Sequence, residues 1–133
     1  NLWRAAVNMA VDHPLLGVGL DNFLYAYRGG YIFDAAWQEP NLNHPHNLIL
    51  DFATRLGLLG LLTGAWLVGE AVRSLWTAIK HVDALWLPVA AGLGGGLAAM
   101  VAHGLVDHSF FLVDLAFAFY LILGVGVWLE RPR

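Results

Sequence analysis

Charged residues are scarce in this chain, and cysteine is absent. Only 13% of the 133 residues are Asp, Glu, Lys or Arg, whereas a soluble domain carries about 25%. The lack of cysteine excludes a disulfide framework and a thiolate metal site. The net charge of −3 provides no basic field for nucleic acid. Hydrophobic residues make up 59%, with a mean hydropathy of +0.61, so the composition indicates a membrane protein.

The chain divides into two regions of different composition. Residues 1–46 mix charged, aromatic and apolar side chains, and tyrosine and tryptophan favour the membrane–water boundary. We expect this region to be the end of a large loop outside the membrane, with short helices on the membrane surface. Because Asn1 is not a methionine and a helix is expected from Leu2 to Val11, we also expect the chain to be part of a longer protein.

Residues 47–133 are mostly apolar and predict three transmembrane helices, at about 48–72, 84–102 and 110–129. About 20 apolar residues cross a bilayer core. The fold class predicted is therefore all-α, a polytopic membrane protein with part of a surface loop and its short helices in front.

Basic residues give the expected orientation of these helices. Arg73 and Lys80 lie between the first two predicted spans, and Arg131 and Arg133 follow the third. The positive-inside rule places both locations in the cytoplasm. The loop that ends at residue 46 and the turn at Asp107 then face the outside.

The densest polar motif is Asn43-His44-Pro45-His46-Asn47. Proline suits the first turn of a helix, which would put His46 in the first turn of the first span. The N-terminus of that helix favours a phosphate or pyrophosphate nearby. We therefore consider His46 a candidate general base at the membrane surface; the alternative is a histidine that only forms hydrogen bonds at the interface.

A helix starting at this motif would place small residues below the imidazole. At about 100° per residue, the face of His46 recurs at Ala53, Gly57, Gly60 and Gly64. Such a stripe allows a neighbouring helix or a lipid chain to lie close. Gly57, Gly60 and Gly64 are thus predicted to form a helix-packing surface or lipid groove.

Two histidine clusters raise the alternative of a metal site. One is His44 with His46, and the other is His103, Asp107 and His108. We expect Pro45 to aim the first two imidazoles apart, and no His-Glu-x-x-His pattern occurs, so no metal is predicted. His103 and Asp107 would share a helix face if the helix persisted, but a polar turn wetted by interfacial water is slightly favoured.

Several motifs together resemble the O-antigen ligase and polymerase superfamily. They are His46-Asn47 followed by Gly57-Leu58-Leu59-Gly60, the opening Trp3-Arg4-Ala5-Ala6, Asp12-His13-Pro14-Leu15-Leu16-Gly17-Val18-Gly19 with Asn22-Phe23, and Gly104-Leu105-Val106-Asp107-His108-Ser109-Phe110-Phe111. Each motif is short, and the match depends on their order and spacing.

The resemblance implies a membrane glycosyltransferase of the GT-C-like kind in the bacterial inner membrane, with its active site facing the periplasm. Residues 1–46 would then be the end of a large periplasmic loop. Such enzymes move a glycan from undecaprenyl pyrophosphate to a hydroxyl of lipid A core, of a protein or of another glycan. The family histidine corresponds to His46, and we expect inversion, no metal and no cofactor. Most pyrophosphate-binding arginines of the family would lie before Asn1, so this piece alone should be inactive. Candidate substrate-binding residues are Asn47, Arg4, Arg28, His44 and Asp107.

Two other functions stay open from the sequence. One is a polysaccharide polymerase of the same superfamily. The other is a non-enzymatic transporter segment, in which His46, Asp107 and His108 form a proton or ion site. Ionisable residues that lie at span ends rather than in mid-span favour the transferase.

Overall fold

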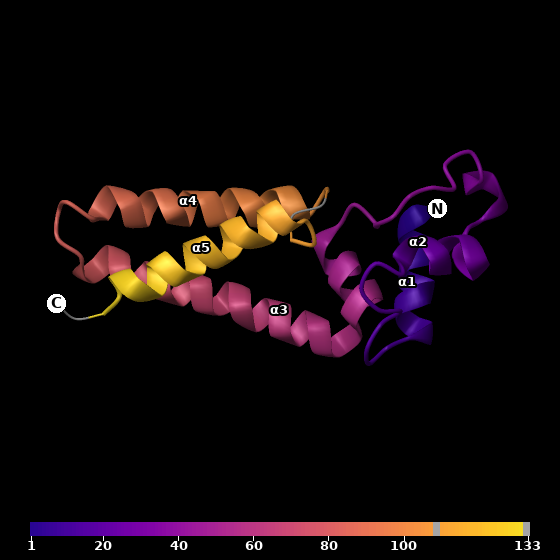
Figure 1. Ribbon diagram of the computed structural model, residues 1–133, viewed down its shortest axis with the longest axis horizontal. Coiled ribbons are helices and arrows are strands. Elements are labelled where there is room, and N and C mark those ends of the chain that lie inside the picture. The colour runs from indigo at the N-terminus through magenta and orange to yellow at the C-terminus, as the bar shows by residue number, and fades with distance from the viewer. Residues whose placement is uncertain (108–109, 132–133) are drawn as a thin grey trace. The chain divides into compact units, whose positions relative to one another are not determined.

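A computed structural model describes residues 1–107 and 110–131, and all regular structure in these ranges is helical (Figure 1). The all-α prediction is therefore confirmed. His108, a member of the alternative metal and ion sites, and Arg133, used for the orientation of the helices, lie outside the described residues. The elements are α1 (Leu2–Asp12), α2 (Phe23–Ala26), the π-helix η1 (Tyr27–Tyr31), the 3-10 helix η2 (Asp34–Ala36), α3 (Leu48–His81), α4 (Leu87–Gly104) and α5 (Val113–Leu129).

The chain forms two compact parts, which are described separately. The N-terminal part holds residues 1–64 and the turn at 105–107, and the three-helix part holds residues 65–104 and 110–131. The predicted boundary at residue 46 differs from this division, because α3 as far as Gly64 packs with the N-terminal residues.

The N-terminal part has its own small core between α1 and the α2–η1 segment. Tyr31 ties the two together, since its hydroxyl donates to Asp12 Oδ2 over 2.9 Å. Partial burial raises the pKa of the Tyr31 hydroxyl, and the hydrogen bond to Asp12 and its negative charge raise it further. The fully buried side chains of this core are Ala5, Ala6, Met9, Phe23 and Tyr27.

Helix α3 is sharply kinked at Gly57. This residue has φ 64° and ψ −156°, a conformation available essentially only to glycine. A Cβ atom there would lie 2.4 Å from the carbonyl carbon of Leu15 and 2.6 Å from the nitrogen of Leu16. Glycine is therefore required at this position for both its conformation and its lack of a side chain.

The loop at residues 14–19 supplies the backbone hydrogen bonds that the kink removes from α3. Without these partners, the N–H groups of Leu58 and Leu59 and the C=O groups of Thr54 and Arg55 would be unpaired, at considerable cost for the two carbonyls, which belong to buried residues. Gly17 lets the loop approach, because a Cβ atom there would lie 2.4 Å from the Thr54 oxygen. The four bonds are Val18 N–H to Thr54 O (2.7 Å), Gly19 N–H to Arg55 O (3.1 Å), Leu58 N–H to Pro14 O (2.8 Å) and Leu59 N–H to Leu15 O (3.3 Å).

The predicted stripe of small residues below His46 is wrong. Helix α3 begins only at Leu48, and His46 itself has a positive φ of 50°. The kink at Gly57 then shifts the phase of every later residue. Gly60 and Gly64 lie against Leu56 and Phe52 of their own helix, so the space beside them is filled by protein rather than open to lipid.

The three-helix part packs the remainder of α3 against α4 and α5. Ala71 and Leu75 of α3, Leu97 of α4 and Phe119 of α5 form one buried cluster. Near the other end, the Trp86 and Trp128 rings meet edge to face, with centroids 5.2 Å apart. Arg73 of α3 donates to Glu130 Oε1 over 3.1 Å, just after α5 ends.

Helices occur at all three places where spans were predicted. By length and composition, α3 and α4 could each cross a membrane, whereas α5 is a shorter apolar helix of 17 residues. After the kink, residues 58–81 run about 36 Å at 1.5 Å per residue. A span within α3 would therefore begin after Gly57 rather than at residue 48. The topology of three crossings stays a prediction.

Candidate functional site

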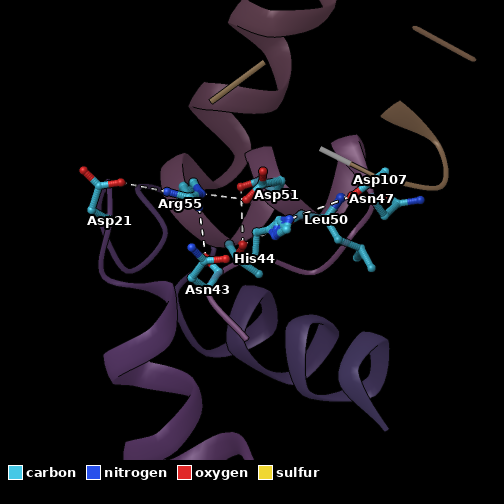
Figure 2. A network of polar contacts seen from close by, with 9 residues as sticks. Asp21, Asn43, His44, Asn47, Leu50, Asp51, Arg55 and Asp107 are labelled. Atoms are coloured by element: carbon cyan, nitrogen blue, oxygen red, sulfur yellow. Dashed lines mark hydrogen bonds and ion pairs between the residues drawn. The ribbon is translucent and has the colours of Figure 1, made fainter. Parts of the chain in front are cut away.

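A buried guanidinium organises the loop that carries the two histidines (Figure 2). Arg55 is 6% exposed, and its Nε donates to Asp51 Oδ1 over 2.6 Å. Its Nη1 donates to Asp21 Oδ1 over 3.1 Å, and its Nη2 donates to the Asn43 carbonyl over 3.0 Å. The last bond fixes the backbone directly before His44. Arg55 thus connects α3 to two loops of the N-terminal part.

The sequence analysis assigned no role to Arg55 and Asp51. Their spacing of four residues was a usable signal, because such pairs are neighbours on a helix. The structure gives Arg55 a positioning role through its hydrogen bond to the Asn43 carbonyl.

The backbone at Pro45 is held from α1. The indole N–H of Trp3 donates to the Pro45 carbonyl over 2.9 Å. With the Arg55 bond to Asn43, this fixes the chain on both sides of His44. The opening tryptophan of the sequence motif therefore helps to position the histidine loop.

Asn47 caps α3 and also holds the distant turn at residues 105–107. Its Oδ1 accepts from the Leu50 N–H over 3.1 Å, the usual contact of an N-terminal cap. Its Nδ2 donates to the Leu105 carbonyl over 2.9 Å. The prediction that Pro45 and His46 lie in the first turn of the helix is wrong, because α3 starts at Leu48.

His46 forms a close pair with Asp107. The distance from His46 Nδ1 to Asp107 Oδ1 is 2.9 Å, and the two side chains are 42% and 47% exposed. Helix α4 ends at Gly104, so His103 and Asp107 do not share a helix face, and Asp107 lies in a turn, as slightly favoured from the sequence. The structure instead brings Asp107 to the imidazole predicted as the base.

His44 joins the same cluster. Its Nε2 lies 3.9 Å from Asp107 Oδ1, and its ring centroid lies 4.1 Å from that of His46. One nitrogen of each histidine and one oxygen of Asp107 all lie within 4.8 Å of one another. The expectation that Pro45 aims the imidazoles apart is therefore wrong. These three residues could hold a metal ion.

A shallow, largely apolar cleft of about 450 Å³ lies beside the histidine loop. It brings together two predicted substrate-binding residues, Arg4 and Asn47. The guanidinium carbon of Arg4 lies 4.9 Å from the centroid of the Phe33 ring, a cation–π distance. Arg28 is exposed on η1 and lines neither this cleft nor the histidine cluster among the described residues. The cleft residues are Trp3, Arg4, Val7, Asn8, Asn47, Ile49 and Leu50.

Comparison with known proteins supports the resemblance found in the sequence. A family model described as O-antigen ligase matches residues 1–65. The match covers the histidine loop and the kink, and it ends before Asp107. Comparison with curated proteins and with solved structures gave no match. The family match and the apolar helices indicate a membrane protein similar to O-antigen ligases and polymerases. The similarity to the O-antigen ligase family covers residues 1–65 of this chain.

Proposed function

We propose that the protein moves a glycan from undecaprenyl pyrophosphate to an acceptor hydroxyl at the periplasmic face of the bacterial inner membrane. The acceptor is a sugar of lipid A core, as in lipopolysaccharide biosynthesis, or a protein hydroxyl. The observation that carries this proposal is the pair of His46 and Asp107 inside a chain whose first half matches the family model.

The His46–Asp107 pair has the arrangement that a general base needs. When Nδ1–H of His46 donates to Asp107, the lone pair of the neutral ring lies on Nε2. The carboxylate then holds the ring in one orientation and stabilises the imidazolium that forms. Since the His46 side chain is 42% exposed, an acceptor hydroxyl can reach it.

The proposed reaction is a direct displacement. The acceptor oxygen attacks the anomeric carbon as its proton passes to His46 Nε2. The bond from that carbon to the pyrophosphate oxygen breaks, and the electron pair leaves with the pyrophosphate. The configuration at carbon is inverted, and the reaction needs no metal, because the diphosphate is a good leaving group that nearby cations stabilise.

The side chains that line the cleft at Arg4 and Asn47 suit a lipid-linked pyrophosphate donor. One guanidinium and two side-chain amides can bind phosphate oxygens, and the apolar residues around them suit the first isoprene units. Asn47 lines this cleft directly after His46, so phosphate and base would lie on the same short loop. We therefore propose Arg4 as a pyrophosphate ligand.

The test is transfer of a lipid-linked glycan by the full-length protein, with lipid A core and a pilin-like protein offered in parallel. His46→Ala should lower the rate about 10²- to 10⁴-fold, the usual contribution of a general base. Asp107→Asn should lower it by about tenfold or more, because an amide can hold the wrong tautomer. His81→Ala, a change at an exposed histidine at the C-terminal end of α3, is the matched control and should be neutral.

Near wild-type transfer by a correctly inserted His46→Ala protein would remove this residue from the mechanism. Chain extension of free lipid-linked glycan without transfer to either acceptor would assign a polymerase instead. The linkage of the product, determined by NMR, tests inversion.

A further inference from the structure

We infer that His44, His46 and Asp107 form a binding site for a divalent transition-metal ion, and that the ion inhibits transfer. The binding half depends only on the cluster geometry. The inhibition half rests on the proposed function of His46.

The donor atoms have nearly the spacing that zinc requires. In a tetrahedral site with metal–ligand bonds near 2.0–2.1 Å, neighbouring ligand atoms lie about 3.3 Å apart. Here Asp107 Oδ1 lies 2.9 Å from His46 Nδ1 and 3.9 Å from His44 Nε2. All three donor atoms lie within 4.8 Å of one another. Small side-chain rotations therefore suffice to place all three around one ion.

The ligands are held in place before a metal arrives. His44 is only 15% exposed, and the carbonyls of Asn43 and Pro45 on either side of it are fixed by hydrogen bonds from Arg55 and Trp3. The turn that carries Asp107 is held by the bond from Asn47 to the Leu105 carbonyl. Less conformational freedom is then lost on binding, which favours affinity.

The donor set selects the class of metal. Two imidazole nitrogens and one carboxylate oxygen suit Zn²⁺ and its neighbours, whereas Mg²⁺ and Ca²⁺ prefer oxygen ligands. His46 and Asp107 are each close to half exposed, which leaves room for a water molecule as a fourth ligand. Three protein ligands with an open fourth position are a common zinc arrangement.

Metal binding would invert the tautomer that catalysis needs. A neutral imidazole has one N–H and one lone pair, so an ion that takes the lone pair of His46 Nδ1 leaves the proton on Nε2. Nε2 then cannot accept a proton from the acceptor hydroxyl. The ion also takes the carboxylate of Asp107 from its hydrogen bond with His46. Zinc should therefore inhibit transfer, because it binds the His46 nitrogen and the Asp107 carboxylate that otherwise form the hydrogen bond needed for catalysis.

The binding test uses metal-stripped full-length protein in detergent, titrated with Zn²⁺ and separately with Co²⁺, whose visible absorption reports coordination geometry. One ion per chain should bind, with a tetrahedral cobalt spectrum. His44→Ala should weaken binding at least about tenfold, since it removes one of three protein ligands. The matched control His81→Ala, at an exposed histidine at the C-terminal end of α3, should bind as wild type does. Equal zinc binding by wild type and His44→Ala would overturn the site.

The inhibition test measures transfer against zinc concentration, with each protein normalised to its own metal-free rate. Wild type should lose activity as the site fills, and His44→Ala should need about ten times more zinc or more, in line with its weaker binding. Undiminished wild-type transfer at saturating zinc would overturn the inhibition. If His46→Ala still transferred glycan while zinc bound wild type as predicted, the proposed function would fail and the metal site would stand.

Discussion

Replacing Gly57 with alanine should destabilise the N-terminal part. The backbone conformation at Gly57 costs a residue with a side chain about 1–3 kcal/mol. The new Cβ atom would also lie within 2.4–2.6 Å of backbone atoms of Leu15 and Leu16, which cannot rotate away as a side chain can. The loop at residues 14–19 must therefore move.

That movement weakens the hydrogen bonds between the loop and the kink. Each such bond contributes about 0.5–1.5 kcal/mol net. Losing two of the four would add about 1–3 kcal/mol, for a total near 2–6 kcal/mol. The same substitution at Gly69 is the matched control, because that glycine is helical and exposed, and a Cβ atom added to it would meet nothing within 4 Å. Alanine there should stabilise the helix by about 0.5–1 kcal/mol.

The assay is reversible unfolding of the full-length variants in mixed micelles, together with hydrogen exchange at the amides of Val18 and Leu58. Gly57→Ala should lower the free energy of unfolding and expose both amides to exchange. The requirement for glycine at the kink would be refuted if the free energies of unfolding of the Gly57 and Gly69 variants agreed within about 1 kcal/mol. Such a difference is no larger than the lowest strain expected for the glycine-only conformation, so glycine would not be required there.

Two further substitutions test how the histidine loop is held. Arg55→Gln removes the cation 2.6 Å from the buried Asp51 carboxylate and should cost about 3–5 kcal/mol, with reduced transfer. Adding Asp51→Asn should restore part of that stability, and a double variant no more stable than Arg55→Gln would contradict the pairing. Asn47→Ala should cost about 1–2 kcal/mol in thermal unfolding, because the helix cap and the bond to Leu105 are both lost. Asn47→Ser keeps a capping oxygen, so its stability should lie between those of wild type and Asn47→Ala. Equal losses of stability for Ala and Ser would argue against a cap.

The sequence was sufficient for the features that depend on local pattern. Apolar runs located the three long helices, and the motif around His46 pointed to the histidine cluster. Proline suits a helix start, but α3 begins at Leu48, three residues after Pro45, which lies in the loop before the helix. Gly57 was interpreted as a packing residue, since sequence does not distinguish a glycine needed for its lack of a side chain from one needed for its conformation.

Contacts between distant segments were beyond sequence reasoning. His46 and Asp107 are 61 residues apart, and no periodicity relates them. The role of Arg55 depends on two loops whose paths were not predictable. The spacing of Asp51 and Arg55 could have been used, because it indicates an ion pair on one helix turn, but it was overlooked.

The exchange of hydrogen bonds between α3 and residues 14–19 limits how relatives of this chain can vary in length. Adding or deleting one residue in that loop would put each N–H and C=O out of step with its partner across the kink. The segment from residue 32 to residue 42 has no comparable set of bonds to α3 among the described residues. Insertions that alter what the protein recognises should therefore accumulate in residues 32–42, whereas the loop at residues 14–19 should keep a constant length.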